Sequence, residues 1–422
     1  MTVSKTRCAA KDTAHLLDQL ARRERGRLIA DLVHRLGPHR LELAEDVVQE
    51  AVLAAMAGWP FGGVPENPGA WLARVARNKA VDRLRREGRE NPFEDNEAQP
   101  DAAANPEVAE IRIQDPELKL IFLCCHSALS QKDSLMLTLK IVSGFTARDI
   151  ASVFLVPEAG VAQRLARAKR KLRSLQQDVV EAPSRFELAR RQPAVMKIIY
   201  LMFSASYMPR SGDQLILEDV ALEALRLARL IADERETGSG ETQALAALLS
   251  FQCSRFKARL DKHDKLCLLK DQNRNLWDQR LIQEGMRYLV AAQKAKVITR
   301  YHLEAGIAAA HATALSWGAV NWSAICGLYD KLSDLTGSPV VALNACVAKA
   351  FAGAPQEALR ALEDISKAGA LTAYAPLYQA RAEILLLLGR KTEAAEAFEQ
   401  AQARSVSAPV DTHIKERLLS CL

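Results

Sequence analysis

Two successive amphipathic helices within residues 41–87 constrain the fold of this chain more than any other segment. The first, residues 41–59, is acidic, and five glycine or proline residues follow it before Gly69. The second has small or apolar residues at helical spacing, a pattern that a helix buries on one side. Its apolar positions are Ala73, Ala76, Ala80 and Leu84, and its basic positions are Arg74, Arg77, Lys79, Arg83, Arg85 and Arg86. The pattern predicts a helix pair with one buried stripe and one guanidinium-rich, hydrated face.

A basic helix face of this kind suits a polyanion such as nucleic acid. Asn78 adds an amide that can form two hydrogen bonds with a base, and Trp71 adds a plane on which a base can stack. The alternatives are a solvated helix surface for the charges and a core position for Trp71. The segment alone does not decide between them.

A second element, residues 144–173, favours nucleic acid. Thr146 and Asp149 predict a capped helix start, and Pro157 separates a short first helix from a second one. The second helix has an apolar stripe formed by Val161, Leu165, Ala168 and Leu172. Between Gly160 and Arg173 it carries six basic residues and no acid. Two short helices, a tight turn and a basic second helix are typical of a helix-turn-helix, although a basic αα-hairpin is an alternative.

Together the two segments resemble the extracytoplasmic-function group of bacterial RNA polymerase sigma factors. Residues 28–88 resemble sigma region 2, and residues 116–174 resemble sigma region 4. The resemblance implies an all-α protein that binds the clamp and flap of core RNA polymerase and promoter DNA. In the family an Asp-x-x-Gln-acid motif docks on the clamp, and this motif reads Asp46, Gln49 and Glu50 here.

The resemblance also implies two DNA-reading surfaces. The loop 65–70 and the helix after it would open and read the −10 promoter element, and the helix 158–173 would read the −35 element. The expected −10 residues are Trp71, Asn78, Asp82, Arg83, Arg85 and Arg86. A helix in the major groove contacts base edges mainly from its N-terminal end. We therefore expect base contacts from Glu158, Gln163 and Arg164, and phosphate contacts from Arg167, Lys169 and Arg170.

The composition agrees with an all-helical, cytoplasmic protein. Aromatic residues make up only 5% of the 422-residue chain, and β-branched runs are few. The net charge of +6 is spread evenly, because residues 1–190 hold 29 Lys and Arg against 26 Asp and Glu, a net of +3. The basic character is therefore local. The eight cysteines form no CxxC motif, and no signal peptide or membrane span is evident.

Composition and punctuation predict five segments. Region 2 occupies residues 1–90, an acidic flexible linker follows at 91–115, and the helix-turn-helix of region 4 occupies 116–175. A helical extension is expected at 185–335, with helices that include 242–260 and 275–294, and helical repeats are expected at 336–422. The linker would let two DNA-reading domains reach promoter elements that lie far apart.

The extension is the main departure from most members of the family. Its last helices match a tetratricopeptide-like repeat at Tyr378, Ala382, Leu385, Gly389, Ala394, Phe398 and Ala401. A weaker copy upstream includes Gly353, which precedes Gly389 by 36 residues. Such repeats suit a protein or peptide partner. The architecture resembles a subgroup in which the extension is thought to govern sigma activity. Residues 204–206 read Ser-Ala-Ser where relatives would carry Asn-Glu-Gly, which puts the regulatory mode in doubt.

The sequence offers two further candidate sites for metal ions, and neither has the ligands that a metal site requires. Adjacent Cys124, Cys125 and His126 lack the spacing of a metal site. Asp271, Asn273 and Asn275 resemble the start of a calcium loop but fit a helix N-cap better, because the later ligands of such a loop are missing. We expect no metal, no cofactor and no enzyme activity. The alternatives to a sigma factor are a helix-turn-helix regulator that does not recruit polymerase, and an interaction scaffold or enzyme with merely solvated basic helices.

Overall fold

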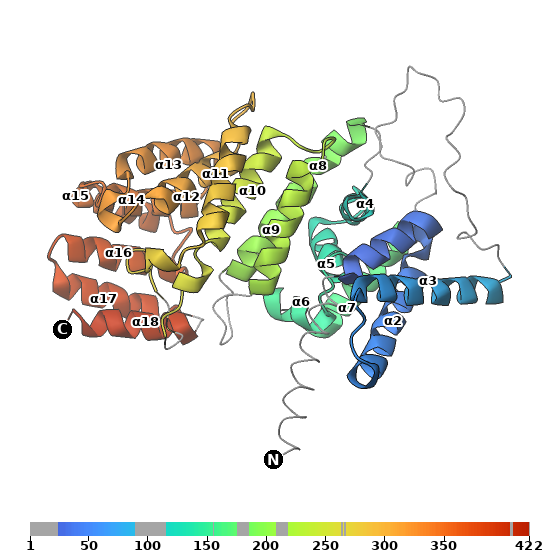
Figure 1. Cartoon of the computed structure of the whole chain (residues 1–422). Coiled ribbons are helices and arrows are strands. Elements are labelled where there is room, and N and C mark those ends of the chain that lie inside the picture. Colours follow the sequence, from blue (N-terminus) through green and yellow to red (C-terminus); the bar gives the residue numbers. More distant parts are fainter. Residues whose placement is uncertain are drawn as a thin grey trace, which may run out of the picture. The chain divides into compact units, whose positions relative to one another are not determined.

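The structure is a computed structural model of the whole chain (Figure 1). It describes residues 24–88, 115–154, 156–174, 185–207, 218–262, 265, 267–405 and 408–421. Within these ranges the chain forms helices and no β-strand, which confirms the predicted all-α class. It divides into two compact units: residues 1–202 with 234–237, and residues 203–233 with 238–422. The predicted linker, residues 91–115, lies outside the described residues except for Asp115.

The first half of unit 1 consists of a helix over residues 24–36, a short 3-10 turn η1 (Pro38–Arg40), α2 (Leu41–Gly62) and α3 (Pro68–Arg86). Asn67 caps α3, because its side chain accepts a hydrogen bond from the Ala70 amide at 3.0 Å. The predicted buried stripe of α3 needs one correction: Leu72 is buried and Ala73 is only half-buried. With Leu72 the stripe repeats every four residues, so these side chains meet α2 on one side.

The second half of unit 1 contains α4 (Pro116–Cys124), α5 (Gln131–Ile141), α6 (Ala147–Phe154) and α7 (Glu158–Arg173). The predicted cap of α6 is confirmed, because Thr146 and Asp149 exchange backbone and side-chain hydrogen bonds of 2.7–3.1 Å. Pro157 is the N-cap of α7. The predicted buried stripe of α7 is also confirmed in full. Helices α6 and α7 pack against each other and on α5 as a helix-turn-helix.

Most of α8 (Arg185–Tyr207) belongs to unit 1 as well. It adjoins the region 4 helices, because Arg190 Nη2 lies 3.4 Å from Ser127 Oγ. Farther along, the Gln192 amide donates to the Thr237 carbonyl at 2.9 Å. Residues 234–237 are therefore attached to α8 in this unit.

Unit 2 is a succession of helices in which each packs mainly on its neighbours in sequence, as in a solenoid (Figure 1). Its helices are α9 (Glu218–Asp233), α10 (Gly240–Cys253), α11 (Gln279–Ala292), α12 (Arg300–Thr313), α13 (Trp322–Thr336), α14 (Pro339–Phe351), α15 (Pro355–Lys367), α16 (Ala375–Leu387), α17 (Lys391–Gln402) and α18 (Ala408–Leu419). Short 3-10 turns η3 (Phe256–Ala258), η4 (Arg274–Leu276) and η5 (Trp317–Ala319) lie between them.

Two helix boundaries in unit 2 differ from those expected. The helix expected to run to residue 260 ends at Cys253, where the Ser254 hydroxyl donates to the Phe251 carbonyl at 2.7 Å and the chain passes into η3. The helix expected from residue 275 starts at Gln279, because Asp278 caps its first turn. Asn273 caps η4 instead, which agrees with a capping role for the calcium-loop-like segment.

The predicted repeats are two helix pairs, α14–α15 and α16–α17, each joined by a three-residue turn. Gly353 and Gly389 occupy equivalent places in these turns, with positive φ angles of 98° and 74° that favour glycine. Ala382, Leu385, Ala394, Phe398 and Ala401 of the predicted repeat are all buried in one core, which also includes Ile414 of α18.

Two further features concern membrane-spanning helices and cysteines. Among the described residues no helix is long and apolar enough to cross a bilayer. All seven cysteines in the described part are unpaired thiols, and five of them are buried. The segment boundaries at residues 90, 115, 175 and 335 stay predictions.

Candidate functional site

Helix α2 presents the predicted polymerase-binding residues on its outer side. Its inner face is buried through Ala44, Val47, Val48 and Ala51. Asp46 and Gln49 are exposed, and Glu50 is half-exposed. Their spacing of three and four residues places the three side chains on one side of the helix, as docking on another helix requires.

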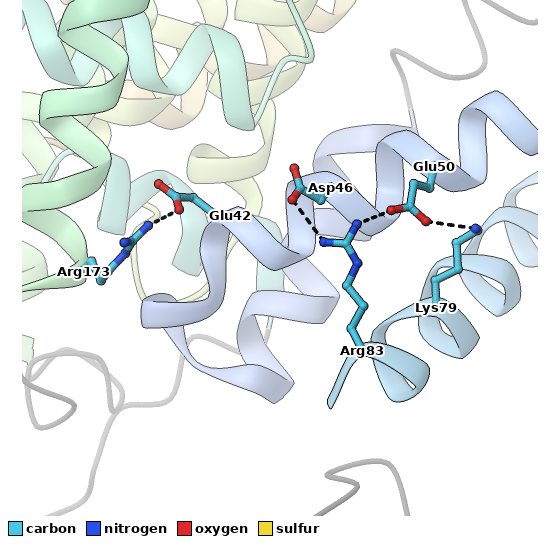
Figure 2. Close-up of polar contacts among 6 residues, drawn as sticks. All are labelled: Glu42, Asp46, Glu50, Lys79, Arg83 and Arg173. Atoms are coloured by element: carbon cyan, nitrogen blue, oxygen red, sulfur yellow. Dashed lines mark hydrogen bonds and ion pairs between the residues drawn. The ribbon is translucent and has the colours of Figure 1, made fainter. Parts of the chain in front are cut away.

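The two acidic members of this set, Asp46 and Glu50, contact α3. Arg83 donates from Nη1 to Asp46 Oδ2 at 3.2 Å and from Nη2 to Glu50 Oε1, and Lys79 Nζ lies 2.9 Å from Glu50 Oε2 (Figure 2). The hydrogen bond from Lys79 is the main reason that the pKa of the Glu50 carboxyl lies below its ordinary value. The predicted polymerase-binding and −10-binding sets therefore share one ion-pair network.

Trp71 lies at the start of α3, where its ring contacts Trp59 of α2. The two ring centroids are 5.4 Å apart in an edge-to-face arrangement. Trp59 is buried, whereas Trp71 is half-buried. Trp71 therefore has a structural contact and keeps part of its ring accessible, which is compatible with both alternatives considered for it.

The remaining predicted −10 residues lie along the outer side of α3. Asn78, Asp82, Arg85 and Arg86 are all exposed, and the loop before α3 is mostly exposed from Val64 to Ala70. The structure thus gathers the predicted −10 set on one helix and the loop that leads to it. The arrangement combines cations for phosphates with an aromatic ring for unstacked bases.

Helix α7 carries the predicted −35 set at positions outside its buried stripe. Glu158, Gln163, Arg167 and Arg170 are exposed. Two other members of the set are engaged within the protein. Arg164 Nη1 pairs with Asp133 of α5 at 3.2 Å, and Lys169 Nζ lies 2.5 Å from Glu45 Oε2 of α2.

Sequence reasoning missed several residues of this site. Glu42 pairs with Arg173 at the end of α7 (Figure 2). Glu45, Asp133 and Trp59 are partners of predicted residues. The signal for Glu42 and Glu45 was present in the acidic first half of α2. Their partners could not be identified from it, because Glu42 and Arg173 are 131 positions apart.

Unit 2 has its own polar–aromatic cluster, where Arg274 lies over the ring of Trp277 at 4.4 Å. Arg274 Nη1 also donates to the carbonyls of His311 and Ala314 at 2.6 and 2.8 Å. The His311 ring stacks on Trp317 with centroids 6.0 Å apart. Burial, with nearby Arg255 and Arg274, lowers the pKa of His311 to about 4. Among the described residues no group of His, Cys, Asp and Glu could hold a metal ion, here or elsewhere.

Comparison with known proteins agrees with the geometry. Residues 22–90 match the family described as sigma-70 region 2, and residues 119–172 match sigma-70, region 4. Residues 191–293 match a family of unknown function (DUF6596). The chain is 35% identical over 383 residues to an uncharacterized protein of Rhizobium meliloti (strain 1021), a match that covers 90% of each chain. No solved structure matches. The chain therefore belongs to the sigma-70 family, as an extracytoplasmic-function-like sigma factor with a helical C-terminal extension.

Proposed function

We propose that this protein binds core RNA polymerase through α2, directs initiation at promoters read by α3 and α7, and is regulated by its extension. The observation that carries the proposal is the presence on one chain of region 2 and region 4, each with the expected residues on an accessible helix. The proposal includes no catalytic step by this protein.

The polymerase contact would be made by the outer side of α2. Exposed Asp46 and Gln49 offer a carboxylate and an amide one helical turn apart, which suits side chains projecting from a partner helix. Glu50 is held by Lys79 and Arg83 and would contribute through the charge and position of that network. The clamp of core polymerase is the expected partner of this surface, and the flap is the expected partner of region 4.

The −10 element would be read as single-stranded bases. Unstacking a base costs a few kcal/mol, which stacking on an aromatic ring can offset. Trp71 is braced from one side by Trp59 and could receive a base on its accessible part. Asn78 and Asp82 could contact base edges, and Arg83, Arg85 and Arg86 could contact phosphates.

The −35 element would be read as a duplex by α7. Its N-terminal end carries the exposed Glu158 and Gln163, the positions from which a recognition helix reaches base edges. Arg167, Lys169 and Arg170 are farther along and suit phosphates. Asp133 already orients Arg164 at 3.2 Å, so this arginine could reach a base with little loss of side-chain freedom.

The extension would tune this activity. Its repeats form a buried core of their own and could receive a protein or peptide partner. Substituting Ala382, which is fully buried in that core, with Asp should change promoter output in vivo. Unchanged output from a variant whose repeats have unfolded would count against a regulatory role.

The test of the proposed function is complex formation with purified core polymerase, measured by size-exclusion chromatography. We expect the native chain to co-elute with polymerase and the Asp46→Ala/Gln49→Ala variant to lose most of the complex. Both side chains are exposed, so helix content and duplex DNA binding should be retained. Asp31→Ala, which removes a half-exposed acid of region 2 on another helix, is the control and should bind normally. Absence of a complex with the native chain would favour a DNA-binding regulator that does not recruit polymerase.

A further inference from the structure

We propose that the extension binds the C-terminal end of a partner polypeptide whose last residue is apolar. The site consists of Arg274 and Trp277, which lie between α10 and α11, and of an apolar surface that follows the end of α12 (Figure 1). All of these residues belong to unit 2. The regulatory meaning of such binding rests on the proposed function, whereas the binding itself does not.

Arg274 is a half-buried cation whose described partners are neutral. Its Nη1 donates to the carbonyls of His311 and Ala314 at the end of α12, at 2.6 and 2.8 Å. The carbonyl end of a helix offers only about half of a negative charge. Burial and the positive charge of Arg255 lower the pKa of Arg274. A full negative charge beside Arg274 would therefore stabilise this cluster.

Two buried donors of the cluster are unused. Arg274 Nη2 and Trp277 Nε1 are both inaccessible to solvent, and neither has a hydrogen-bond partner among the residues that the structure describes. The two side chains are in contact, because Arg274 Cζ lies 4.4 Å from the centroid of the Trp277 ring. Burying a donor without an acceptor is costly. The cluster thus lacks both an acceptor and a negative charge, and a carboxylate provides both.

An apolar surface adjoins the cluster. Ala314, whose carbonyl Arg274 binds, is followed by Leu315, which is 93% exposed. The turn η5 then packs Trp317 against Trp322 and Phe351, with ring centroids 4.7 and 5.1 Å apart. All three rings are half-buried, so part of each is accessible. Aromatic residues and arginine are the residue types that contribute most to binding at protein interfaces.

A chain end fits both parts of this site. Its carboxylate has two acceptor oxygens and a full charge, and its side chain leaves from the same Cα atom. Arg274 and Leu315 are likewise adjacent, since Arg274 binds the carbonyl of the residue before Leu315. An inorganic anion would leave the apolar surface unused. Capture of a C-terminal carboxylate is one of the recurring modes of peptide recognition.

The test measures peptide binding by the full chain labelled with 15N-tryptophan. The probe is acetyl-Ala-Ala-Ala-Leu with a free C-terminal carboxylate, and the matched probe is its C-terminal amide. The indole N–H signals of Trp277, Trp317 and Trp322 report on the site, and those of Trp59 and Trp71 report on region 2. We expect the acid to shift the Trp277 signal saturably and to leave the region 2 signals unchanged. The amide should bind at least about ten-fold more weakly, because it lacks the charge.

Two variants place the binding at the cluster. Arg274→Gln should abolish the shift of Trp277, whereas Arg280→Gln, which removes an exposed arginine of α11, should not. If Arg274→Gln fails to fold, Leu315→Ser provides the comparison, because this exposed side chain contributes little to folding. Leu315→Ser should weaken binding by about five-fold. Its control is Leu335→Ser, at a position of α13 that is 54% exposed.

Several results would overturn the inference. They are equal binding of the acid and the amide, no shift of Trp277 with either, and native affinity in Leu315→Ser. A third probe, acetyl-Ala-Ala-Leu-Asp-amide, carries its carboxylate on a side chain. Binding of this probe as tight as that of the free acid would overturn the assignment to a chain end.

Peptide binding and polymerase binding can fail independently. Binding of the acid by a chain that forms no complex with core polymerase would support the site and reject the proposed function. A chain that binds polymerase but not the acid would have the opposite meaning.

Discussion

Helices α3 and α7 are built alike but are neutralised differently. Each buries a four-residue stripe and presents a basic face, and each pairs with acids of α2. The α2 acids that pair with α3 belong to its own domain, whereas the α2 acids that pair with α7 belong to the other sigma domain. Asp133 of α5 is a further partner of α7 from its own domain. The comparison teaches that one acidic helix can pair both with the basic helix of its own domain and with a basic helix of the other domain.

The difference has a functional consequence. Pairs such as Arg83–Asp46 can persist when region 2 binds polymerase, because both side chains move with the same domain. In the proposed function, pairs such as Lys169–Glu45 would exchange their carboxylate for a phosphate when region 4 reaches its DNA element. Substitutions in the two networks should therefore be distinguishable by the salt dependence of DNA binding.

The largest expected effect comes from the buried stripe of α7. Leu165→Ala removes a side chain that is 6% exposed and should destabilise region 4 by about 2–5 kcal/mol. Chemical unfolding followed by circular dichroism would measure this loss, and duplex DNA binding should fall with it. Arg167→Ala on the exposed face of α7 should weaken DNA binding while leaving the unfolding midpoint unchanged. Equal stability of Leu165→Ala and the native chain would contradict the observed packing.

The stability of the extension should depend on pH through His311. The folded-state pKa of His311 is about 4 against an ordinary value of 6.5, so the unfolded chain binds this proton first as pH falls. Stability contributed by neutral His311 is fully present above pH 6.5 and is lost between pH 6.5 and 4, by about 3 kcal/mol in total. Tryptophan fluorescence of the unfolding extension would report it through Trp317 and Trp322, which lie beside His311.

The control for this pH effect is His311→Phe, which removes the titrating group and keeps a ring. The stability of this variant should depend less steeply on pH between 6.5 and 4 than the stability of the native chain. Some slope should remain, because burial also lowers the pKa of His302 and His413. An unchanged slope would show that His311 does not control the stability of the extension.

A smaller effect should come from overpacking α3. Ala80 is fully buried against α2, so Ala80→Leu should destabilise region 2 by about 1–3 kcal/mol. The exposed Ala57 of α2 gives the matched control, and Ala57→Leu should leave the thermal midpoint nearly unchanged. If Ala80→Leu were equally harmless, the α2–α3 contact would be looser than the structure shows.

The smallest expected effect concerns the network of α2 and α3. Glu50→Gln breaks partly exposed ion pairs with Lys79 and Arg83, so it should cost at most about 1 kcal/mol. The pKa of Glu50 is lowered in the folded chain, so its contribution is present above its ordinary pKa and is lost as pH falls through the folded value. The thermal unfolding midpoint of Glu50→Gln should therefore lie slightly below that of the native chain at pH 7, and the two midpoints should coincide in strong acid. A difference that persists there would have another cause.

Local features of the fold could be predicted from the sequence. The stripe of α7 and the cap formed by Thr146 and Asp149 follow from spacing and side-chain chemistry within a few residues. The predicted stripe of α3 was wrong at one position, where Leu72 rather than Ala73 is buried. Both residues are apolar, so the helical period alone does not show which of them points inward. The early end of α10 was also missed, because no proline or glycine marks it.

Features that depend on distant parts of the chain could not be predicted. The acids of α2 were visible, but their division between α3 and α7 depends on how helices separated by more than a hundred residues pack together. A Cβ atom at Gly26 would lie 1.8 Å from the carbonyl oxygen of Val142, so the reason for glycine there is likewise visible only in the fold. Polar partners across a tertiary contact leave no periodic signal in sequence.

The most direct test of the sigma-factor function is run-off transcription by purified core polymerase with this protein. Templates would carry the regions upstream of its own gene and of neighbouring operons. We expect a discrete start site that depends on the added protein and is lost with Asp46→Ala/Gln49→Ala. Base substitution upstream of that site would then define the two promoter elements. No transcript and no complex with core polymerase would contradict the proposed function.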